Sequence, residues 1–517
     1  MQAAELLIRV AIEKGVEICF ANAGTTELPI VMALDRTPGI RCVLGLFEGI
    51  CTGAADGYGR MLDKPAMTLL HLGPGLANGI ANLHNARRAK SPVLNVIGEH
   101  ATWHRDADPP LAMDIESLAR TVSGWWRTTK SPQDISRDFA EALGAARLGQ
   151  VATLIVPHDY QLTECDGCQA EVPGVSFDPA DRNLVEMAAE RLRTSPKAAL
   201  LLGGRALRKP GLDAAARIKR ATGCDLFAPT LFGYMERGAG LPFVERIPYF
   251  PEQATAMLSK YESIVLAGAT EPVTFFGYPG IQGRILNNQQ ERIPLCADQQ
   301  DVVEVLESLA DALGGPRRIS PDDFVFTKPS QPALPSGELT PEKACLTLAA
   351  LQPDSAIVID ESVTMGSIYF SATTGVHLHS LLGVPGGSIG QGIPCATGAA
   401  IACPTRPVIN LEADGSAMYT IQALWTQARE ELNVTTLICS NQSYRILQVE
   451  LARDGVTSLG PNVEALTELK KPAIDWVKIA QGFGIPGVRV NTVEDLAREL
   501  GRALAEPGPH LIEMLLP

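Results

Sequence analysis

Two apolar runs near the carboxyl end of the chain, each followed by a short polar segment, constrain its fold most strongly. Residues 408–411 lead into A-D-G-S at 413–416, and residues 434–439 lead into S-N-Q-S at 440–443. The stretch between them is expected to form a helix that ends near Glu431. A strand, a crossover helix and a second strand form a parallel unit, in which both polar segments fall at the carboxyl edge of the sheet.

The same alternation of short apolar runs and helical stretches recurs through all 517 residues. A chain of this length is too long for one hydrophobic core. We therefore expect an α/β protein with three doubly wound parallel-sheet domains. Their expected bounds are residues 1–165, 180–315 and 342–517, with a Pro- and Ser-rich linker at 316–341.

The composition is that of an ordinary globular protein, with 46% apolar and 20% charged residues. A formal net charge of −14 argues against nucleic acid or an anionic membrane as a partner, because both favour clustered Lys and Arg. The sequence has no run of 18 apolar residues, so no transmembrane helix is expected. Eleven cysteines in so long a chain do not indicate a disulfide framework, and a reducing, cytoplasmic location is expected.

Asp414 and Asn441 are the first candidates for chemistry, because both follow strands of the same expected sheet. Carboxylate and amide oxygens are hard ligands, and a helix N-terminus beside them favours phosphate groups. The pattern therefore indicates a site for Mg²⁺ carrying a diphosphate. Taken alone, D-G-S is more often a tight turn or a helix N-cap. The asparagine after the next strand favours the metal site.

Glu48 is the second candidate. It opens the segment E-G-I-C-T-G-A-A-D-G-Y at 48–58, in which small and apolar residues surround one carboxylate. A helix so rich in small residues packs closely against a neighbour, and a half-buried carboxylate there could share a proton with a heterocyclic nitrogen. The alternative is a structural glutamate favoured by the helix dipole.

Three further segments carry weaker signals. G-G-S-I-G-Q-G at 386–392 is a glycine-rich loop before a helix, which lets the backbone approach a ligand closely. His71 follows the expected strand 66–70 and could act as an acid or base at the sheet edge; a buried structural histidine is the alternative. Thr25 lies in the equivalent loop after the first strand, where its hydroxyl could hold a substrate carboxylate or cap a helix.

Over nearly its whole length the chain resembles the thiamine diphosphate-dependent enzymes, whose cofactor motif is a G-D-G segment followed at a distance by N-N. The sequence departs from that motif at Ala413 and Ser440, where glycine and asparagine are usual. The resemblance implies that Mg²⁺ is held by the side chains of Asp414 and Asn441 and by the main-chain carbonyl of Ser443.

The resemblance also implies roles for the other candidates. Glu48 would be the glutamate that activates the cofactor by sharing a proton with a ring nitrogen. Ile389 would be the bulky side chain between the two cofactor rings, and the carbonyl of Gly387 would accept from the cofactor's amino group. The remaining cofactor-binding residues implied are Gly415, Ser416 and Thr364.

Within the family the chain looks like the acetohydroxyacid (acetolactate) synthase large subunits and the benzoylformate decarboxylases. His71 matches the decarboxylases, but their second histidine has no counterpart at 272–278, which argues against an efficient proton relay. Glu99 stands where the synthases usually carry glutamine. The expected reaction is decarboxylation of pyruvate or a similar 2-oxo acid followed by carboligation, with aldehyde release as the alternative. The chain is short for a synthase that holds FAD, so FAD is not expected.

The substrate pocket implied by the resemblance includes Gln391, Leu447 and Glu450, and Glu450 favours small or polar substrates. A homodimer or homotetramer is also implied, in which Glu48 of one subunit meets the third domain of another. Two other classes of protein fit less well. A Rossmann dehydrogenase needs G-x-G-x-x-G directly after a strand, which residues 73–78 do not supply. A non-catalytic relative would lack Glu48 or Asp414.

Overall fold

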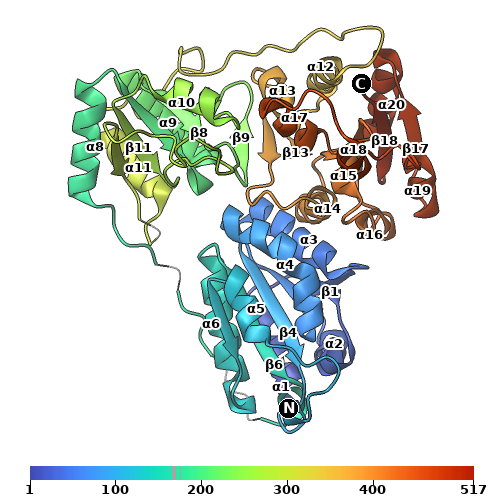
Figure 1. Cartoon of the computed structure of the whole chain (residues 1–517). Helices are drawn as coiled ribbons and strands as arrows, with labels where there is room; N and C mark the ends of the chain where they lie inside the picture. Colours follow the sequence, from blue (N-terminus) through green and yellow to red (C-terminus); the bar gives the residue numbers. More distant parts are fainter. Residues whose placement is uncertain (166–169, 175, 298) are drawn as a thin grey trace.

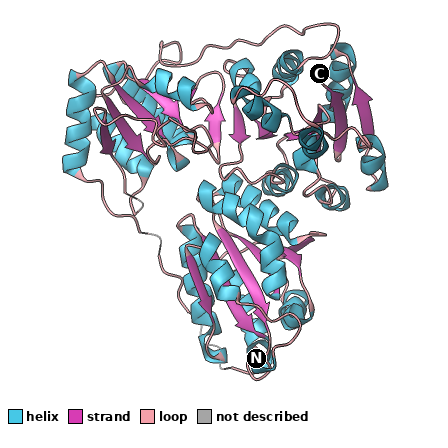
Figure 2. Ribbon diagram, viewed as in Figure 1, coloured by secondary structure: helices cyan, strands magenta, loops and turns pink. Residues whose placement is uncertain are grey.

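The computed structural model describes residues 1–165, 170–174, 176–297 and 299–517. It contains three sheets of mainly parallel strands, which confirms the expected fold class. Figure 1 shows the three units as separate blocks, and Figure 2 shows helices flanking each sheet. Among the described residues, no helix is both long and apolar enough to cross a membrane.

The first unit is a six-stranded parallel sheet in the order β2-β1-β3-β4-β6-β5. Its central strands are apolar and almost wholly buried, because helices cover both faces of the sheet. The strands are β1 Ile18–Asn22, β2 Arg41–Leu44, β3 Ala66–His71, β4 Val93–Glu99, β5 Trp125–Thr128 and β6 Val151–Pro157. The helices are α1 Ala3–Glu13, α2 Leu28–Arg36, α3 Glu48–Leu62, α4 Leu72–Ala89, α5 Ile115–Val122, α6 Ile135–Arg147 and α7 His158–Leu162, and a 3-10 turn, η1, spans Thr25–Glu27.

The second unit is a five-stranded parallel sheet in the order β10-β8-β7-β11-β12. Its strands are β7 Ala198–Leu202, β8 Asp225–Ala228, β10 Glu245–Arg246, β11 Ser263–Ala267 and β12 Glu291–Pro294. The helices are α8 Arg182–Thr194, α9 Lys209–Thr222, α10 Pro251–Leu258 and α11 Val302–Ala312. After α11 the chain runs without a helix to Pro341, and Figure 1 shows this segment spanning the second and third units.

The third unit is a seven-stranded sheet in the order β17-β18-β16-β15-β13-β14-β9. Its edge strand β9, Met235–Arg237, comes from the central segment and pairs antiparallel with β14. The other strands are β13 Ala356–Glu361, β14 His379–Leu382, β15 Val408–Ala413, β16 Val434–Ser440, β17 Gly487–Val490 and β18 His510–Leu515. The helices are α12 Pro341–Leu351, α13 Gly366–Ala372, α14 Gly392–Ala402, α15 Asp414–Ala417, α16 Ala423–Arg429, α17 Arg445–Arg453, α18 Pro461–Thr467, α19 Trp476–Gly482 and α20 Val493–Ala505.

The prediction of a single helix after Asp414 is wrong, because the structure has two short helices, α15 and α16, separated by a turn. Within that turn, the Thr420 hydroxyl donates to the carbonyl of Gly390 at 2.9 Å. This tertiary contact draws the chain towards the glycine-rich loop, which helical periodicity alone does not reveal.

The first and third units pack against each other through α3 and α14, which lie side by side in Figure 1. Small residues permit the contact. A Cβ atom on Gly57 would overlap the carbonyl of Cys395, and one on Gly398 would overlap the carbonyl of Ala54. The small residues that mark the segment after Glu48 therefore serve this close packing of two helices.

Candidate active site

Asp414 lies directly after β15, beside the end of the neighbouring strand β16. It is 2% exposed. One carboxylate oxygen accepts from the amide of Gly415 at 2.8 Å, and the other accepts from the amide of Gln442 at 2.6 Å. Burial raises the pKa of the Asp414 carboxyl to about 6, against the opposing effect of these two amides. The carboxylate is thus fixed between two strand ends by main-chain groups.

Asn441 follows β16 on the adjacent loop. Its side-chain oxygen accepts from the amide of Ser443 at 2.9 Å and from the Ser443 hydroxyl at 3.2 Å. The structure therefore brings the loops of Asp414 and Asn441 together at one sheet edge. A carboxylate and an amide oxygen on neighbouring loops are the hard oxygen donors that Mg²⁺ prefers, so the residues present fit a magnesium-bound phosphate group.

A cavity of about 230 Å³ opens at this edge. All of its described lining residues come from the third unit, between Pro341 and Pro517. The chain's first unit contributes none of them, so Glu48, His71 and Thr25 lie outside this cavity. The sequence-predicted residues that line it are Thr364, Ile389, Asp414, Gly415, Ser416, Asn441 and Ser443.

Gly387 lies in the loop that carries Ile389 into the cavity. Its φ of +70° is a left-handed conformation that favours glycine. A Cβ atom at this position would stand 2.7 Å from the ring of Phe275, which belongs to the central unit. Glycine is therefore required both by the backbone conformation and by the aromatic side chain packed on it.

Glu361, at the end of β13, fixes the glycine-rich loop by accepting hydrogen bonds from its main chain. Its carboxylate accepts from the amide of Gly390 at 2.6 Å and from the amide of Gly392. Glu412 lies beside it, since a Cβ atom on Gly392 would meet oxygens of both carboxyl groups. Burial raises the pKa of Glu361 to about 7, and burial together with the charge of Glu361 raises the pKa of Glu412. Sequence patterns gave no signal for this buried pair, which lies within otherwise apolar strands.

Gln391 is 1% exposed, and its amide donates to Asp56 of α3 at 2.6 Å. Its side chain thus lies in the contact between the first and third units rather than in the cavity at Asp414. Asn82 of α4 reinforces the same contact, because it donates to the carbonyl of Gly49 at 2.7 Å and to that of Gly390 at 3.3 Å. The loop of Ile389 is therefore fixed partly by the first unit.

Glu48 begins α3 and is half-buried. Its carboxylate accepts from the side-chain amide of Asn78 on α4 at 3.0 Å. Gly75 on the same helix lies next to it, because a Cβ atom there would be in van der Waals contact with the carboxylate, at 3.4 Å. Glu48 is thus oriented by a neighbouring helix at the edge of the first sheet.

His71 ends β3 and contacts a buried glutamate that the sequence analysis missed. Its Nδ1 lies 2.8 Å from a carboxylate oxygen of Glu27 and 3.2 Å from the hydroxyl of Thr26. The Thr26 hydroxyl also donates to Glu27 at 2.6 Å. Thr25, the predicted residue of this loop, is exposed at the start of η1. A Cβ atom on Gly98 would overlap the Glu27 carboxylate. The glycine that follows the apolar run of β4 is therefore the sequence feature that could have indicated a buried side chain packed at this position.

Leu447 and Glu450 lie on α17, on the side that faces the central unit. Glu450 accepts from the hydroxyl of Tyr278 at 3.1 Å and pairs with Arg453 at 3.5 Å. The Arg453 guanidinium stacks on the Tyr278 ring at 3.9 Å from its centroid. The carboxylate of Glu450 is therefore bound by other groups of the protein. Its charge was the reason for favouring small or polar substrates, and these contacts weaken that argument.

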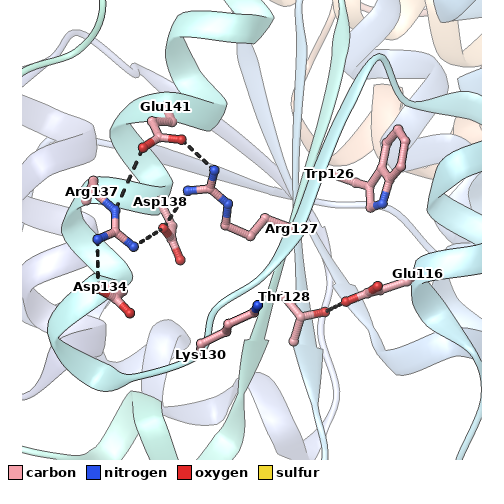
Figure 3. A pocket seen from close by; sticks show the side chains of 9 residues that line it. All are labelled: Glu116, Trp126, Arg127, Thr128, Lys130, Asp134, Arg137, Asp138 and Glu141. Atoms are coloured by element: carbon pink, nitrogen blue, oxygen red, sulfur yellow. Dashed lines mark hydrogen bonds and ion pairs between the residues drawn. The ribbon is translucent and has the colours of Figure 1, made fainter.

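A second cavity, of about 580 Å³, lies between the edge strand β5 and α6. Figure 3 shows its charged side chains facing one another. Arg127 pairs with Asp138 and Glu141, and Arg137 pairs with Asp134 as well as Asp138. Both arginines form ion pairs with carboxylates of the chain itself. Among the described lining residues, this cavity does not combine a carboxylate and a side-chain amide on neighbouring strand ends, as the cavity at Asp414 does.

Comparison with known proteins agrees with this geometry. Residues 1–118 match the thiamine pyrophosphate enzyme N-terminal TPP binding domain, and residues 365–514 match the corresponding C-terminal TPP binding domain. The chain belongs to the thiamine pyrophosphate-dependent enzymes that act on 2-oxo acids, as its sequence motifs predicted.

Among its relatives, the chain is 47% identical over 520 residues to a Mycobacterium tuberculosis protein provisionally named acetolactate synthase large subunit IlvX, covering 100% of this chain and 99% of that protein. It is 28% identical to benzoylformate decarboxylase of Pseudomonas aeruginosa, covering 97% and 96% of the two chains. Its fold matches a solved 4-hydroxybenzoylformate decarboxylase of Rhodococcus jostii with a TM-score of 0.86 at 23% identity, covering 100% and 99% of the chains.

Proposed function

We propose that the protein is a magnesium-dependent, acetolactate synthase-like enzyme that decarboxylates a small 2-oxo acid such as pyruvate and joins the remaining fragment to a second carbonyl compound. The observation that carries this proposal is the cavity at Asp414, where hard oxygen donors from two adjacent loops converge. The 47% identity to the mycobacterial relative supports the choice of reaction.

The residues of the cavity fit the cofactor. Asp414, Asn441 and the main-chain carbonyl of Ser443 would hold Mg²⁺, and Gly415 and Ser416 would contact the diphosphate, with Thr364 on the same wall. Bound thiamine diphosphate supplies the carbanion chemistry needed to break and form bonds beside a 2-oxo group. The protein's own task is to bind, to orient and to move protons.

Glu48 is the proposed proton-sharing residue for the cofactor ring nitrogen. The Asn78 amide fixes its direction, and the half-buried position limits competition by water. Ile389 lines the cavity and would support the bent conformation of the cofactor. The loop that carries it is held by Glu361 and Asn82, so its position is set before any ligand binds.

Carboligation is favoured by the side chain that packs on Gly387. Phe275 has no ionisable group, so at this part of the loop it would supply no proton to a bound substrate. Without a proton donor there, joining to a second carbonyl compound would compete better with aldehyde release. The alternative outcome, aldehyde release, is favoured by the His71–Glu27 pair, in which a carboxylate orients an imidazole that could donate a proton.

Because no first-unit residue lines the Asp414 cavity of the same chain, we further propose that Glu48 completes the site of a second copy in a homodimer or homotetramer. Several exposed apolar side chains on the segments around η1 and just before Glu48 support this proposal, since groups of such side chains mark interaction surfaces. They are Leu28, Met32 and Leu46.

The test is a product analysis. The purified protein with thiamine diphosphate and Mg²⁺ is incubated separately with pyruvate, 2-oxobutyrate and benzoylformate, and CO₂, aldehyde and acetohydroxy acid are each measured. Acetolactate as the main product from pyruvate is the expected result. Benzaldehyde from benzoylformate, with no acetolactate from pyruvate, would establish the alternative. The absence of CO₂ from every 2-oxo acid would refute both.

A further inference from the structure

Arg445 is the only cationic side chain among the described residues that line the cavity at Asp414. It is the first residue of α17, two positions after Ser443. Its side chain is exposed, and it takes part in no hydrogen bond or ion pair within the described chain.

The other arginine of the same helix behaves differently. Arg453 pairs with Glu252 and Glu450 and stacks on Tyr278, so its charge is neutralised by the protein. Arg445 lies at the opposite end of the helix, where it lines the cavity, and it pairs with neither of the two acidic lining residues, Asp414 and Glu342. An unpaired guanidinium in a cavity wall is available to an anionic group of a ligand.

The charge balance of the loaded cavity points the same way. A diphosphate ester carries about two to three negative charges at neutral pH, which at least cancels the two positive charges of one Mg²⁺ ion, and the Asp414 carboxylate adds negative charge beyond that. An arginine can neutralise this excess, because its guanidinium donates two parallel hydrogen bonds to phosphate oxygens.

We infer that Arg445 is a phosphate-binding residue that donates to the terminal phosphate of the cofactor. The inference rests on the proposed function, because it takes thiamine diphosphate as the ligand of this cavity. It adds a side-chain cation to a site whose other described lining side chains are neutral or acidic. Arg445 therefore contributes to affinity and to the choice of a diphosphate over a monophosphate.

The experiment compares two ligands that differ only in the terminal phosphate. Apoprotein is prepared with a chelator, and binding of thiamine diphosphate and of thiamine monophosphate is measured by calorimetry at one fixed Mg²⁺ concentration. In Arg445→Gln the Kd for the diphosphate should rise roughly 10- to 100-fold, because a charge-assisted bond is lost. The Kd for the monophosphate should change by less than about 3-fold. Arg445→Lys should recover part of the loss.

Arg9→Gln is the matched control, because Arg9 is also an exposed helical arginine without a partner in the described chain but lies on α1 of the first unit. It should bind both ligands like the wild type. Equal Kd values for the diphosphate in Arg445→Gln and the wild type would overturn the inference, as would an equal loss for both ligands, which indicates a structural role. Failure of the wild type to bind the diphosphate would instead refute the proposed function, and the inference with it.

Discussion

The two sheet edges that carry the predicted site residues are built differently. At the third sheet, the Asp414 carboxylate is buried in a cavity and held by two main-chain amides. At the first sheet, Glu48 is half-buried and is held by one side chain, that of Asn78. One edge carries a cavity whose described lining comes from a single unit, whereas the other is a partly open surface that presents polar groups.

This difference matches the two roles we propose, in which the Asp414 edge binds the cofactor and the Glu48 edge activates it. Main-chain amides cannot rotate away, so the pocket at Asp414 is preorganised for its ligand in the isolated chain. The edge at Glu48 has fewer fixed contacts, and the exposed side chain of Leu46 lies two positions before Glu48. We propose that this edge becomes part of an active site when a second copy of the chain covers it.

The largest expected effect comes from substituting one residue at each edge and then mixing the two inactive variants. Glu48→Gln and Asp414→Ala should each reduce turnover roughly 10³-fold or more, because each removes a group required at every site. If the sites are shared between subunits, mixing the two variants and allowing subunit exchange should restore about a quarter of wild-type activity. Half of the dimers are then mixed, and each mixed dimer has one intact site.

The control mixes Glu48→Gln with Glu48→Ala. These variants carry the same defect, so their mixed dimers contain no intact site and should stay inactive. Subunit exchange is verified by mass spectrometry of the mixed dimers. Complete exchange without recovery of activity between Glu48→Gln and Asp414→Ala would show that the two edges do not meet across subunits.

A smaller effect is expected at the first edge alone, from Glu27→Gln. The substitution keeps the size of the side chain but removes the charge that orients His71, so kcat should fall roughly 10- to 10³-fold. Affinity for thiamine diphosphate should not change, because Glu27 lies outside the Asp414 cavity. Steady-state kinetics and calorimetry on the same preparation measure both quantities.

Asp35→Asn is the matched control for this prediction, because Asp35 is an exposed carboxylate on α2, the helix that follows the same turn. It should retain activity to within about 3-fold. Wild-type kcat in Glu27→Gln would argue against a role for the His71–Glu27 pair, and a loss of cofactor affinity would indicate a wider structural defect.

Four of the groups named from the sequence share one property, because each lies at the end of a strand or at the start of a helix: Glu48, His71, Asp414 and Asn441. Asp414, Asn441 and His71 follow apolar runs, so parallel-sheet topology places them at an edge without knowledge of tertiary contacts. This local regularity is why the fold class, and the placing of Asp414 and Asn441 on neighbouring loops, could be predicted.

The groups that were missed depend on contacts between distant segments. Phe275 reaches Gly387 from another unit, and Tyr278 reaches Glu450 in the same way. Glu361 looks like the polar end of a buried strand until the glycine-rich loop is placed over it. No periodicity encodes such approaches, and the break between α15 and α16 has the same origin in a tertiary hydrogen bond.

The smallest expected effect tests how the third edge is stabilised, and it concerns Glu361. Burial raises the pKa of this carboxyl from 4.5 to about 7. A group whose pKa is higher in the folded state contributes stability that is fully present below its unfolded pKa and is lost as pH rises through the folded pKa. The contribution of Glu361 should therefore decline between about pH 4.5 and pH 7. Glu361→Gln cannot ionise, so its stability should lack this part of the decline.

Urea denaturation of the wild type and Glu361→Gln, at pH values below and above this window, measures the difference. At the acidic end the variant should have a smaller free energy of unfolding than the wild type. This difference between the two proteins should narrow or reverse towards the neutral end. Glu186→Gln is the control, because Glu186 is exposed on α8, and its difference from the wild type should stay constant. A gap for Glu361→Gln that does not change with pH would mean that the Glu361 proton is not linked to folding, and that the loop of Ile389 is held by its other contacts.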